Sequence, residues 1–255
     1  MIETTQHKSI DPSLAASFDR IYSTDLVYAK DCWQLCGNGH CCNFTRYKSQ
    51  FGMIGKSHFQ ELPLLPDEFN YLESKGWTAQ FGDFEHRVID YPLSMGKMKI
   101  EFLVGRSKTC ACNHDTRTTV CRLYPLLPIF DLDGRLTGVD LEFGIFEEIE
   151  KIDGLERACK IENMPLPELN KFLTITTEIA NRPKALFHAL AYRIAKAHAR
   201  KQLVAVATAN SAAALPTLEA AFLLRRLFDH DALRVEIETL ANAMIERHGA
   251  GTLFD

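Results

Sequence analysis

The sequence predicts an α+β fold, in which a small cysteine-bearing part with β-hairpins and short helices precedes a helical C-terminal part. Two observations support this prediction. Between residues 88 and 143, apolar and polar residues alternate around two turn signals, which is typical of half-buried strands. Beyond residue 165, apolar residues recur every three or four positions, as on amphipathic helices. We place the division at residues 1–160 and 161–255, near Gly154 and a turn at residues 163–165.

Helix start and stop signals predict two short helices in the N-terminal part. Asp11-Pro12-Ser13 can start the first helix, which presents Phe18 and Ile21 on one face and leads the chain towards Cys32. A second helix is predicted within residues 64–76, because proline and acidic residues open this stretch and lysine followed by glycine closes it.

Two β-hairpins are predicted further along the chain. Alternating apolar residues over 98–104, preceded by residues 88–91 and a turn at 94–97, predict the first, whose second strand runs towards Cys110. Asp133-Gly134, flanked by two apolar runs, is the strongest short-range hairpin signal in the chain and predicts the second.

The C-terminal part is predicted to hold four amphipathic helices, with residues 210–216 as a connector. With 46% hydrophobic residues among 255, the chain can bury a large core. The expected apolar faces are Leu169, Phe172, Leu173, Thr176 and Ile179; Leu186, Leu190, Ile194 and Ala197; Leu218 to Phe228; and Leu233, Ile237, Leu240 and Met244.

Charge and hydropathy argue against two classes of partner. Lys and Arg number 29 against 33 Asp and Glu, and no basic run marks a nucleic-acid interface. The N-terminus lacks the basic and apolar regions of a signal peptide, and no stretch approaches the roughly 20 apolar residues of a membrane span. We therefore expect a cytoplasmic protein that binds neither nucleic acid nor a membrane, with any protein partner left open.

Seven of the eight cysteines fall into two groups about 70 residues apart. In a reducing compartment, cysteines at short spacing are more often metal ligands than structural disulfides, and thiolates suit zinc, copper(I) and iron–sulfur clusters. The sequence therefore predicts one metal site that folding completes. Its candidate ligands are Cys32, Cys36, Cys41 and Cys42 in the first group and Cys110, Cys112 and Cys121 in the second.

The spacing within the groups favours more than one metal ion. Adjacent side chains such as those of Cys41 and Cys42 diverge along most backbones, and seven thiolates exceed the four ligands of a mononuclear zinc. The alternative is a set of buried or disulfide-paired cysteines, which is a stronger alternative for the second group. Cys159 stands alone and is expected to pack in the core.

Several neighbouring residues have open roles. His40 and His114 lie inside or beside the cysteine groups and are either ligands or solvated loop residues. Arg117 and Arg122 flank Cys121, where they either offset thiolate charge or are surface or hairpin-paired arginines. Asp131, Asp133, Asp140 and Glu142 could suggest paired catalytic carboxylates, but the Asp131 and Asp133 pair is better explained by turn chemistry at Asp133-Gly134. Common nucleotide-binding and hydrolase motifs are absent, so no catalytic residue is assigned.

The stretch C-x3-C-x4-C-C, followed by C-x-C and by Cys121-Arg-Leu-Tyr-Pro, resembles the YkgJ-type cysteine-cluster family of zinc- or iron-chelating proteins. That family has a CxxCxxxxCC-like signature and a later Cys-Arg-x-Phe-Pro-like motif. Here the first gap is one residue longer, and Cys110 and Cys112 are closer together than is typical. The resemblance covers roughly residues 30 to 130. It implies chelation by Cys36, Cys41, Cys42, Cys110, Cys112 and Cys121, with Cys32 as a further ligand.

The resemblance leaves three functions to compare. The first is a metal-binding protein that chelates zinc or an iron or iron–sulfur centre through both thiolate groups. The second is a metal- or cluster-dependent enzyme for redox or group-transfer chemistry, by analogy with the flagellin lysine-methylating proteins, which carry a related cysteine arrangement. The third is a protein-interaction module in which zinc is purely structural.

Overall fold

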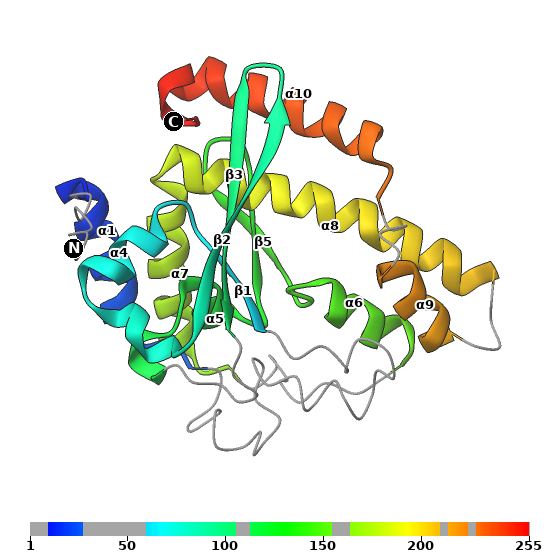
Figure 1. The fold of residues 1–255 in the computed structure, drawn as a ribbon, viewed down its shortest axis with the longest axis horizontal. Helices are drawn as coiled ribbons and strands as arrows, with labels where there is room; N and C mark the ends of the chain where they lie inside the picture. The colour runs from blue at the N-terminus through cyan, green and yellow to red at the C-terminus, as the bar shows by residue number, and fades with distance from the viewer. Residues whose placement is uncertain are drawn as a thin grey trace, which may run out of the picture.

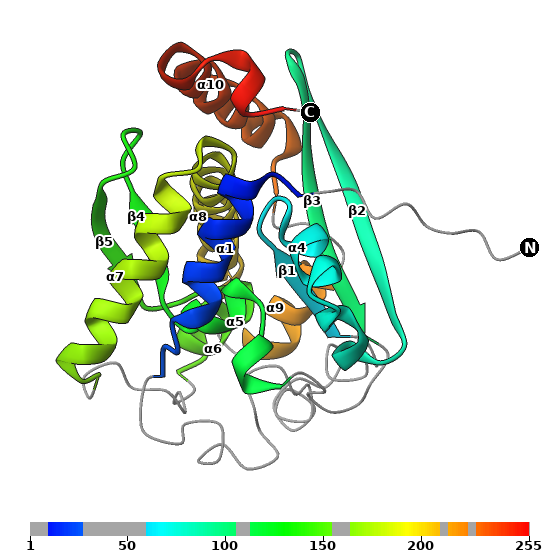
Figure 2. The same cartoon turned by 90° about the vertical axis from the view of Figure 1, so that its left-hand side faces the viewer.

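The structure is a computed structural model that describes residues 10–27, 60–105, 113–154, 164–209, 214–223 and 228–254. Within these ranges the fold is α+β, as the sequence predicts, with two small antiparallel sheets and a set of mostly C-terminal helices (Figure 1). The long helix α8 (Pro183–Ala209) runs through the middle of the molecule. Figure 2 shows the larger sheet on one side of α8 and the smaller sheet with α7 on the other.

Both predicted N-terminal helices are present. The first is α1 (Pro12–Ser23), which Asp11 caps by accepting hydrogen bonds from the amides of Ser13 and Leu14 at 2.9 and 3.1 Å. The second is α4 (Glu68–Ser74), and it ends before Gly76, whose φ of +69° is the left-handed conformation that glycine adopts easily. A short 3₁₀ helix, η2 (Trp77–Phe81), follows it.

The larger sheet contains the predicted first hairpin. Strands β2 (Phe84–Leu93) and β3 (Gly96–Gly105) pair antiparallel, with Leu93 opposite Gly96 across the turn. The sheet order is β1-β3-β2, so β1 (Gln60–Leu64) adds a strand that the sequence did not predict. Pro63 lies within β1, and proline in a short apolar run argues against a strand unless the strand is at an edge, where β1 lies.

The predicted second hairpin is also present. Its strands are β4 (Leu127–Phe130) and β5 (Leu136–Asp140), and Gly134 in the turn has a φ of +78°. The Asp131 carboxylate accepts hydrogen bonds from the amides of Asp133 and Arg135, which confirms a turn role for this aspartate. Two short helices, α5 (Thr119–Leu123) and α6 (Ile145–Ile152), flank the hairpin and were not predicted.

The C-terminal part contains the expected helices: α7 (Leu166–Ala180), α8, α9 (Ala214–Leu223) and α10 (His230–His248). The predicted face of α10 is buried as expected. For α7 the prediction is wrong in part, because Leu169 and Leu173 are each 41% exposed and Ile175 is buried instead. The buried side of α7 faces α1 and α8, and these packing partners set it beyond what the apolar pattern alone specifies.

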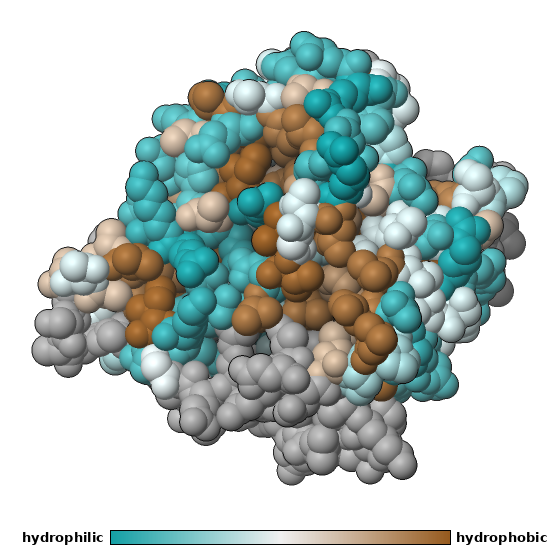
Figure 3. Space-filling view, turned by 180° about the vertical axis from the view of Figure 1, so that it is seen from behind, coloured by the Kyte–Doolittle hydropathy of each residue, from teal (hydrophilic) through white to brown (hydrophobic). Residues whose placement is uncertain are grey.

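One hydrophobic cluster joins the two parts of the chain. It extends from Phe18 of α1 through Leu103 of β3 to Leu186 of α8 and Leu253 near the C-terminus. The C-terminal helices therefore pack directly on the cysteine-bearing part, and the division at residues 160 and 161 stays a prediction. The rear face of the molecule shows apolar side chains gathered near its middle (Figure 3). None of the described helices has the length and apolar character needed to span a membrane.

Candidate metal centre

Cys121 is the one predicted ligand that falls within the described residues. It lies on α5 and is half-buried. The Thr118 hydroxyl donates to its Sγ at 3.2 Å. Cys159 and His40 lie outside the described residues. So do the remaining predicted ligands, namely Cys32, Cys36, Cys41, Cys42, Cys110 and Cys112.

A buried carboxylate fixes α5 in place. Glu68 of α4 is 0% exposed and accepts hydrogen bonds from the amide and the hydroxyl of Thr119 at 2.6 and 2.7 Å. The same carboxylate accepts from the Tyr22 hydroxyl at 2.7 Å and from the Leu65 amide at 2.9 Å. Because an anion at a helix N-terminus satisfies unpaired amides, Glu68 caps the helix that carries Cys121 and joins it to α1 and α4.

Two arginines beside Cys121 are buried rather than at the surface. Arg117 is 8% exposed and Arg122 is 1% exposed, which makes the surface alternative wrong. Their nitrogens donate to backbone carbonyls and, in the case of Arg117, also to the Asp25 carboxylate. Burial and the neighbouring Arg117 lower the pKa of Arg122, yet a guanidinium keeps its charge at any physiological pH.

The described ends that adjoin the two cysteine groups in the sequence lie on the side of the molecule where α5 lies. The end of α1, the end of β3 and α5 all lie on the lower side of Figure 2. The Leu26 carbonyl oxygen accepts a 2.5 Å hydrogen bond from Arg117. Gly105, at the end of β3, pairs with Gln60, and β1 packs against α5. Asn113 donates its amide proton to Gln80 Oε1 at 2.9 Å, and the same oxygen accepts from Thr116 next to Arg117.

His114 lies on the same side and is held by acidic neighbours. Its Nδ1 is 3.6 Å from an Asp25 oxygen and 3.5 Å from an Asp115 oxygen. Burial and the positive charge of Arg117 lower the pKa of His114, against the opposite influence of these carboxylates. The imidazole is therefore neutral at neutral pH, which is the form that can bind a metal.

A second cluster of candidate ligands is formed by three carboxylates. Oxygens of Asp140, Glu142 and Glu148 lie within 4.8 Å of one another. The buried ammonium group of Lys196 lies 2.7 Å from Asp140 and 3.4 Å from Glu148, and Arg200 approaches Glu148 at 3.4 Å. These carboxylates are already neutralised by side-chain cations, so the cluster is an ion-pair network. Sequence reasoning noted positions 140 and 142 but missed Glu148 and Lys196, which only the packing of α6 on α8 brings close.

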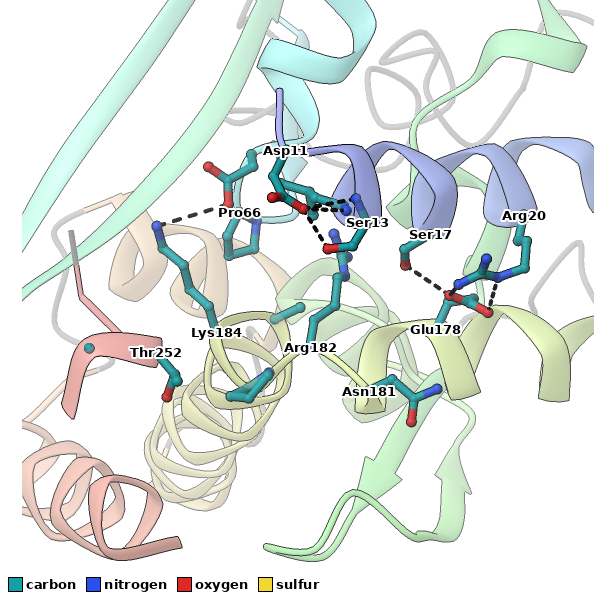
Figure 4. A pocket seen from close by; sticks show the side chains of 15 residues that line it. Asp11, Ser13, Ser17, Arg20, Pro66, Glu178, Asn181, Arg182, Lys184 and Thr252 are labelled. Carbon is teal, nitrogen blue, oxygen red and sulfur yellow. Dashed lines mark hydrogen bonds and ion pairs between the residues drawn. The ribbon is translucent and has the colours of Figure 1, made fainter. Parts of the chain in front are cut away.

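The described residues also line an open cavity of about 780 Å³ between α1 and the junction of α7 with α8 (Figure 4). Most of its charges pair with one another: Arg20 bonds Glu178 at 2.5 and 2.8 Å, and Lys184 lies 4.0 Å from Asp67. Arg182 is different, since its guanidinium nitrogens are buried and make no hydrogen bond. Those nitrogens are covered by protein, so they offer no contact to a molecule in the cavity.

The fold and this site define an α+β protein in which a half-buried thiol lies beside a pair of buried arginines, at the side where the cysteine-bearing segments join the fold. Comparisons of the chain with protein-family models, with curated proteins and with solved structures found no match. The resemblance to the YkgJ-type family therefore rests on the cysteine motifs. A half-buried thiol that accepts a hydrogen bond fits a soft or borderline metal ion such as zinc or iron.

Proposed function

We propose that the protein is a cytoplasmic, YkgJ-like metal-binding protein. It chelates zinc, or an iron or iron–sulfur centre, through two groups of cysteine thiolates, and Cys121 is the last ligand. The observation that supports this most is the anchoring of the chain near α5. Ligands that lie far apart in sequence can share a metal only if the fold brings their segments together.

The described ends set limits on how far the first cysteine of each group can be from the described chain. Cys32 and Cys110 each follow a described end, Val27 and Gly105, by five residues, and a five-residue chain reaches at most about 18 Å. Cys112 directly precedes Asn113. These short lengths support a site that Cys121 shares with thiolates of both groups. The sequence argument for more than one metal ion, based on Cys41 and Cys42, adds the expectation of a polynuclear centre.

The metal would supply different chemistry according to its identity. Zinc bound by four protein ligands is structural, whereas an iron–sulfur centre can carry an electron. The Cys121 side chain lies outside both hydrophobic clusters of the described residues, so the core does not depend on it. This placement favours a centre added to a self-sufficient core over a module held together by zinc. The alternative function is a metal- or cluster-dependent enzyme, by analogy with the flagellin lysine-methylating proteins.

The test is metal analysis of protein purified without oxygen, combined with visible absorption. Iron and sulfide with brown colour would support a cluster, and zinc in colourless protein would support a zinc site. Cys121→Ser should lower the metal content, whereas Cys159→Ser should leave it unchanged, since Cys159 is expected to be a packing residue. A chain that is fully reduced, folded and free of both metals would overturn the proposal.

The same material separates a functional centre from a structural one. Metal-free protein, prepared with a chelator, should keep its helical circular dichroism and a cooperative unfolding transition, because the core closes without Cys121. Complete loss of both on metal removal would instead favour the structural-zinc module.

A further inference from the structure

We propose that Arg117 and Arg122 are positioning residues of the thiolate site, which hold the segment leading to the first cysteine group against α5. This inference rests on the metal-binding function proposed above. It differs from the role expected from the sequence, in which the two arginines offset thiolate charge. The described contacts direct their donors to oxygen atoms of the main chain.

Arg122 is fully buried and bonds three main-chain carbonyls. Its Nη1 donates to the carbonyl oxygen of Thr24 at 3.0 Å, and its Nε donates to the carbonyl of Arg117 at 3.1 Å. Its Nη2 donates to the carbonyl of Asp115. The guanidinium also lies 4.7 Å from the centre of the Tyr22 ring on α1. The residue next to Cys121 thus joins the end of α1 to the loop before α5.

Arg117 continues the same set of contacts. Its Nη2 donates to the Leu26 carbonyl at 2.5 Å, and its Nη1 donates to the carbonyl of His114. Both Nη atoms also lie 3.4 to 3.5 Å from the Asp25 carboxylate. One guanidinium therefore connects residues 25 and 26 to the residues that directly follow Cys112.

Each of residues 24–27 makes a main-chain hydrogen bond to a side chain, although these residues belong to no helix or strand. The carbonyls of Thr24, Asp25 and Leu26 accept hydrogen bonds from three different cations, namely Arg122, Lys171 and Arg117. The Val27 amide donates to Glu168 of α7 at 2.8 Å. Side chains from α5 and α7 thus provide the partners that a helix or sheet would provide, so the start of the first cysteine-bearing segment is fixed relative to Cys121.

Arginine is suited to this task because its planar group has five donors in a fixed arrangement. A buried guanidinium is costly unless acceptors surround it, and carbonyl oxygens meet that need without removing its charge. Lysine at the same position keeps the charge, but its three donors lie on a single nitrogen, which cannot replace the three separate guanidinium nitrogens that bond these carbonyls. Arg122→Lys therefore separates a positioning role from a purely electrostatic one.

The experiment measures metal affinity in variants that are still folded. Arg122→Lys and Arg117→Lys should each weaken zinc binding by about 10- to 100-fold in competition with a chromophoric chelator, as expected when residues that orient ligands are lost. Iron content after reconstitution with ferrous iron and sulfide should fall in parallel. Arg182→Lys is the matched control, since Arg182 is a buried arginine stacked on Phe18 whose guanidinium bonds neither residues 24–27 nor the loop before α5. It should leave metal affinity unchanged.

A merely structural role would lower the stability of the metal-free protein and leave affinity unchanged at temperatures where the variant is folded. Combining Arg122→Lys with Cys121→Ser gives a second readout, because two changes that act on the same site should lower affinity by less than the sum of their separate effects.

If wild-type protein takes up neither zinc nor iron, the proposed function fails. If it binds metal and the folded lysine variants bind with wild-type affinity, the positioning inference fails alone. Arg117→Lys, whose partner Asp25 is half-exposed, provides the test if Arg122→Lys does not fold.

Discussion

The Glu68 carboxylate accepts a 2.6 Å hydrogen bond from the Thr119 amide, so a side chain of α4 caps the helix that carries Cys121. The carboxylate is fully buried and takes four hydrogen bonds in total. Burial and Glu68 together raise the pKa of the Tyr22 hydroxyl, which donates to it. Glu68 is therefore a structural anion that holds the support of the candidate centre.

Glu68→Gln should destabilise the protein by about 2 to 3 kcal/mol, because an amide cannot accept all four donors and places an NH₂ group against some of them. Urea unfolding followed by circular dichroism measures the change. Glu73→Gln on the exposed side of α4 is the control and should shift the free energy of unfolding by less than about 0.5 kcal/mol. Equal stability of the two variants would contradict this account of Glu68.

These contacts also show why the sequence could predict some elements and not others. Asp11 capping α1 and the Asp133-Gly134 turn depend on residues that are neighbours in the chain, and both predictions are confirmed. Helix α5 has only five residues, and its cap comes from a residue 51 positions away. Local propensity carries no signal for such an element.

The same reasoning applies to the candidate site. The residue type and spacing of cysteines indicate that they can bind a metal, so Cys121 could be identified as a candidate ligand from the sequence. The acceptors of Arg117 and Arg122 are main-chain carbonyls as far as 91 and 98 positions away. Any residue type can supply a carbonyl, so the sequence shows two arginines beside a cysteine but not what they hold.

Lys196→Met should destabilise the protein by about 3 kcal/mol, because it removes the ammonium group that pairs with the half-buried Asp140 and the buried Glu148. Burial raises the pKa of Asp140, but hydrogen bonds from Lys196 and from the Glu142 amide outweigh this influence and lower it. Without Lys196 the pKa of Asp140 should rise, so the loss relative to wild type should shrink as the pH falls. Urea unfolding between pH 4 and 8 tests this, with exposed Lys201→Met as the control. A loss that does not depend on pH would contradict the assigned charge pairing.

Glu178 of α7 ties this helix to α1 and should contribute a pH-dependent part of stability. It accepts from the Ser17 hydroxyl and bonds both Nε and Nη2 of Arg20 (Figure 4). Burial raises the pKa of Glu178, but the bonds from Arg20 and Ser17 more than offset it, so the pKa lies below 4.5. A group with a lowered folded pKa stabilises the protein above its unfolded pKa, and this contribution is lost as the pH falls below about 4.5.

Glu178→Gln should therefore lower stability at pH 7 and flatten its decline in acid. Thermal unfolding at several pH values between 3 and 7 measures both effects. Glu246→Gln, on an exposed position of α10, should keep the wild-type pH profile. A Glu178→Gln variant with the full acid decline of wild type would show that other carboxylates produce it.

Replacing Arg182 should affect stability much less than replacing Arg122, although both are buried arginines stacked against an aromatic ring. The Arg182 guanidinium lies 4.3 Å from the centre of the Phe18 ring, and none of its nitrogens has a hydrogen-bond partner. Burial lowers its pKa, while the acidic groups of Glu68, Asp67 and Glu178 act against this shift. Methionine has a similar length and no desolvation cost, so Arg182→Met should change stability by less than about 1 kcal/mol, or raise it. Arg122→Met should cost about 3 kcal/mol or more, because it leaves three carbonyl oxygens without donors. Parallel urea unfolding of the two variants measures the difference. If Arg182→Met lowers the free energy of unfolding by more than about 1 kcal/mol, the neighbouring carboxylates need the positive charge of Arg182, although its guanidinium makes no hydrogen bond.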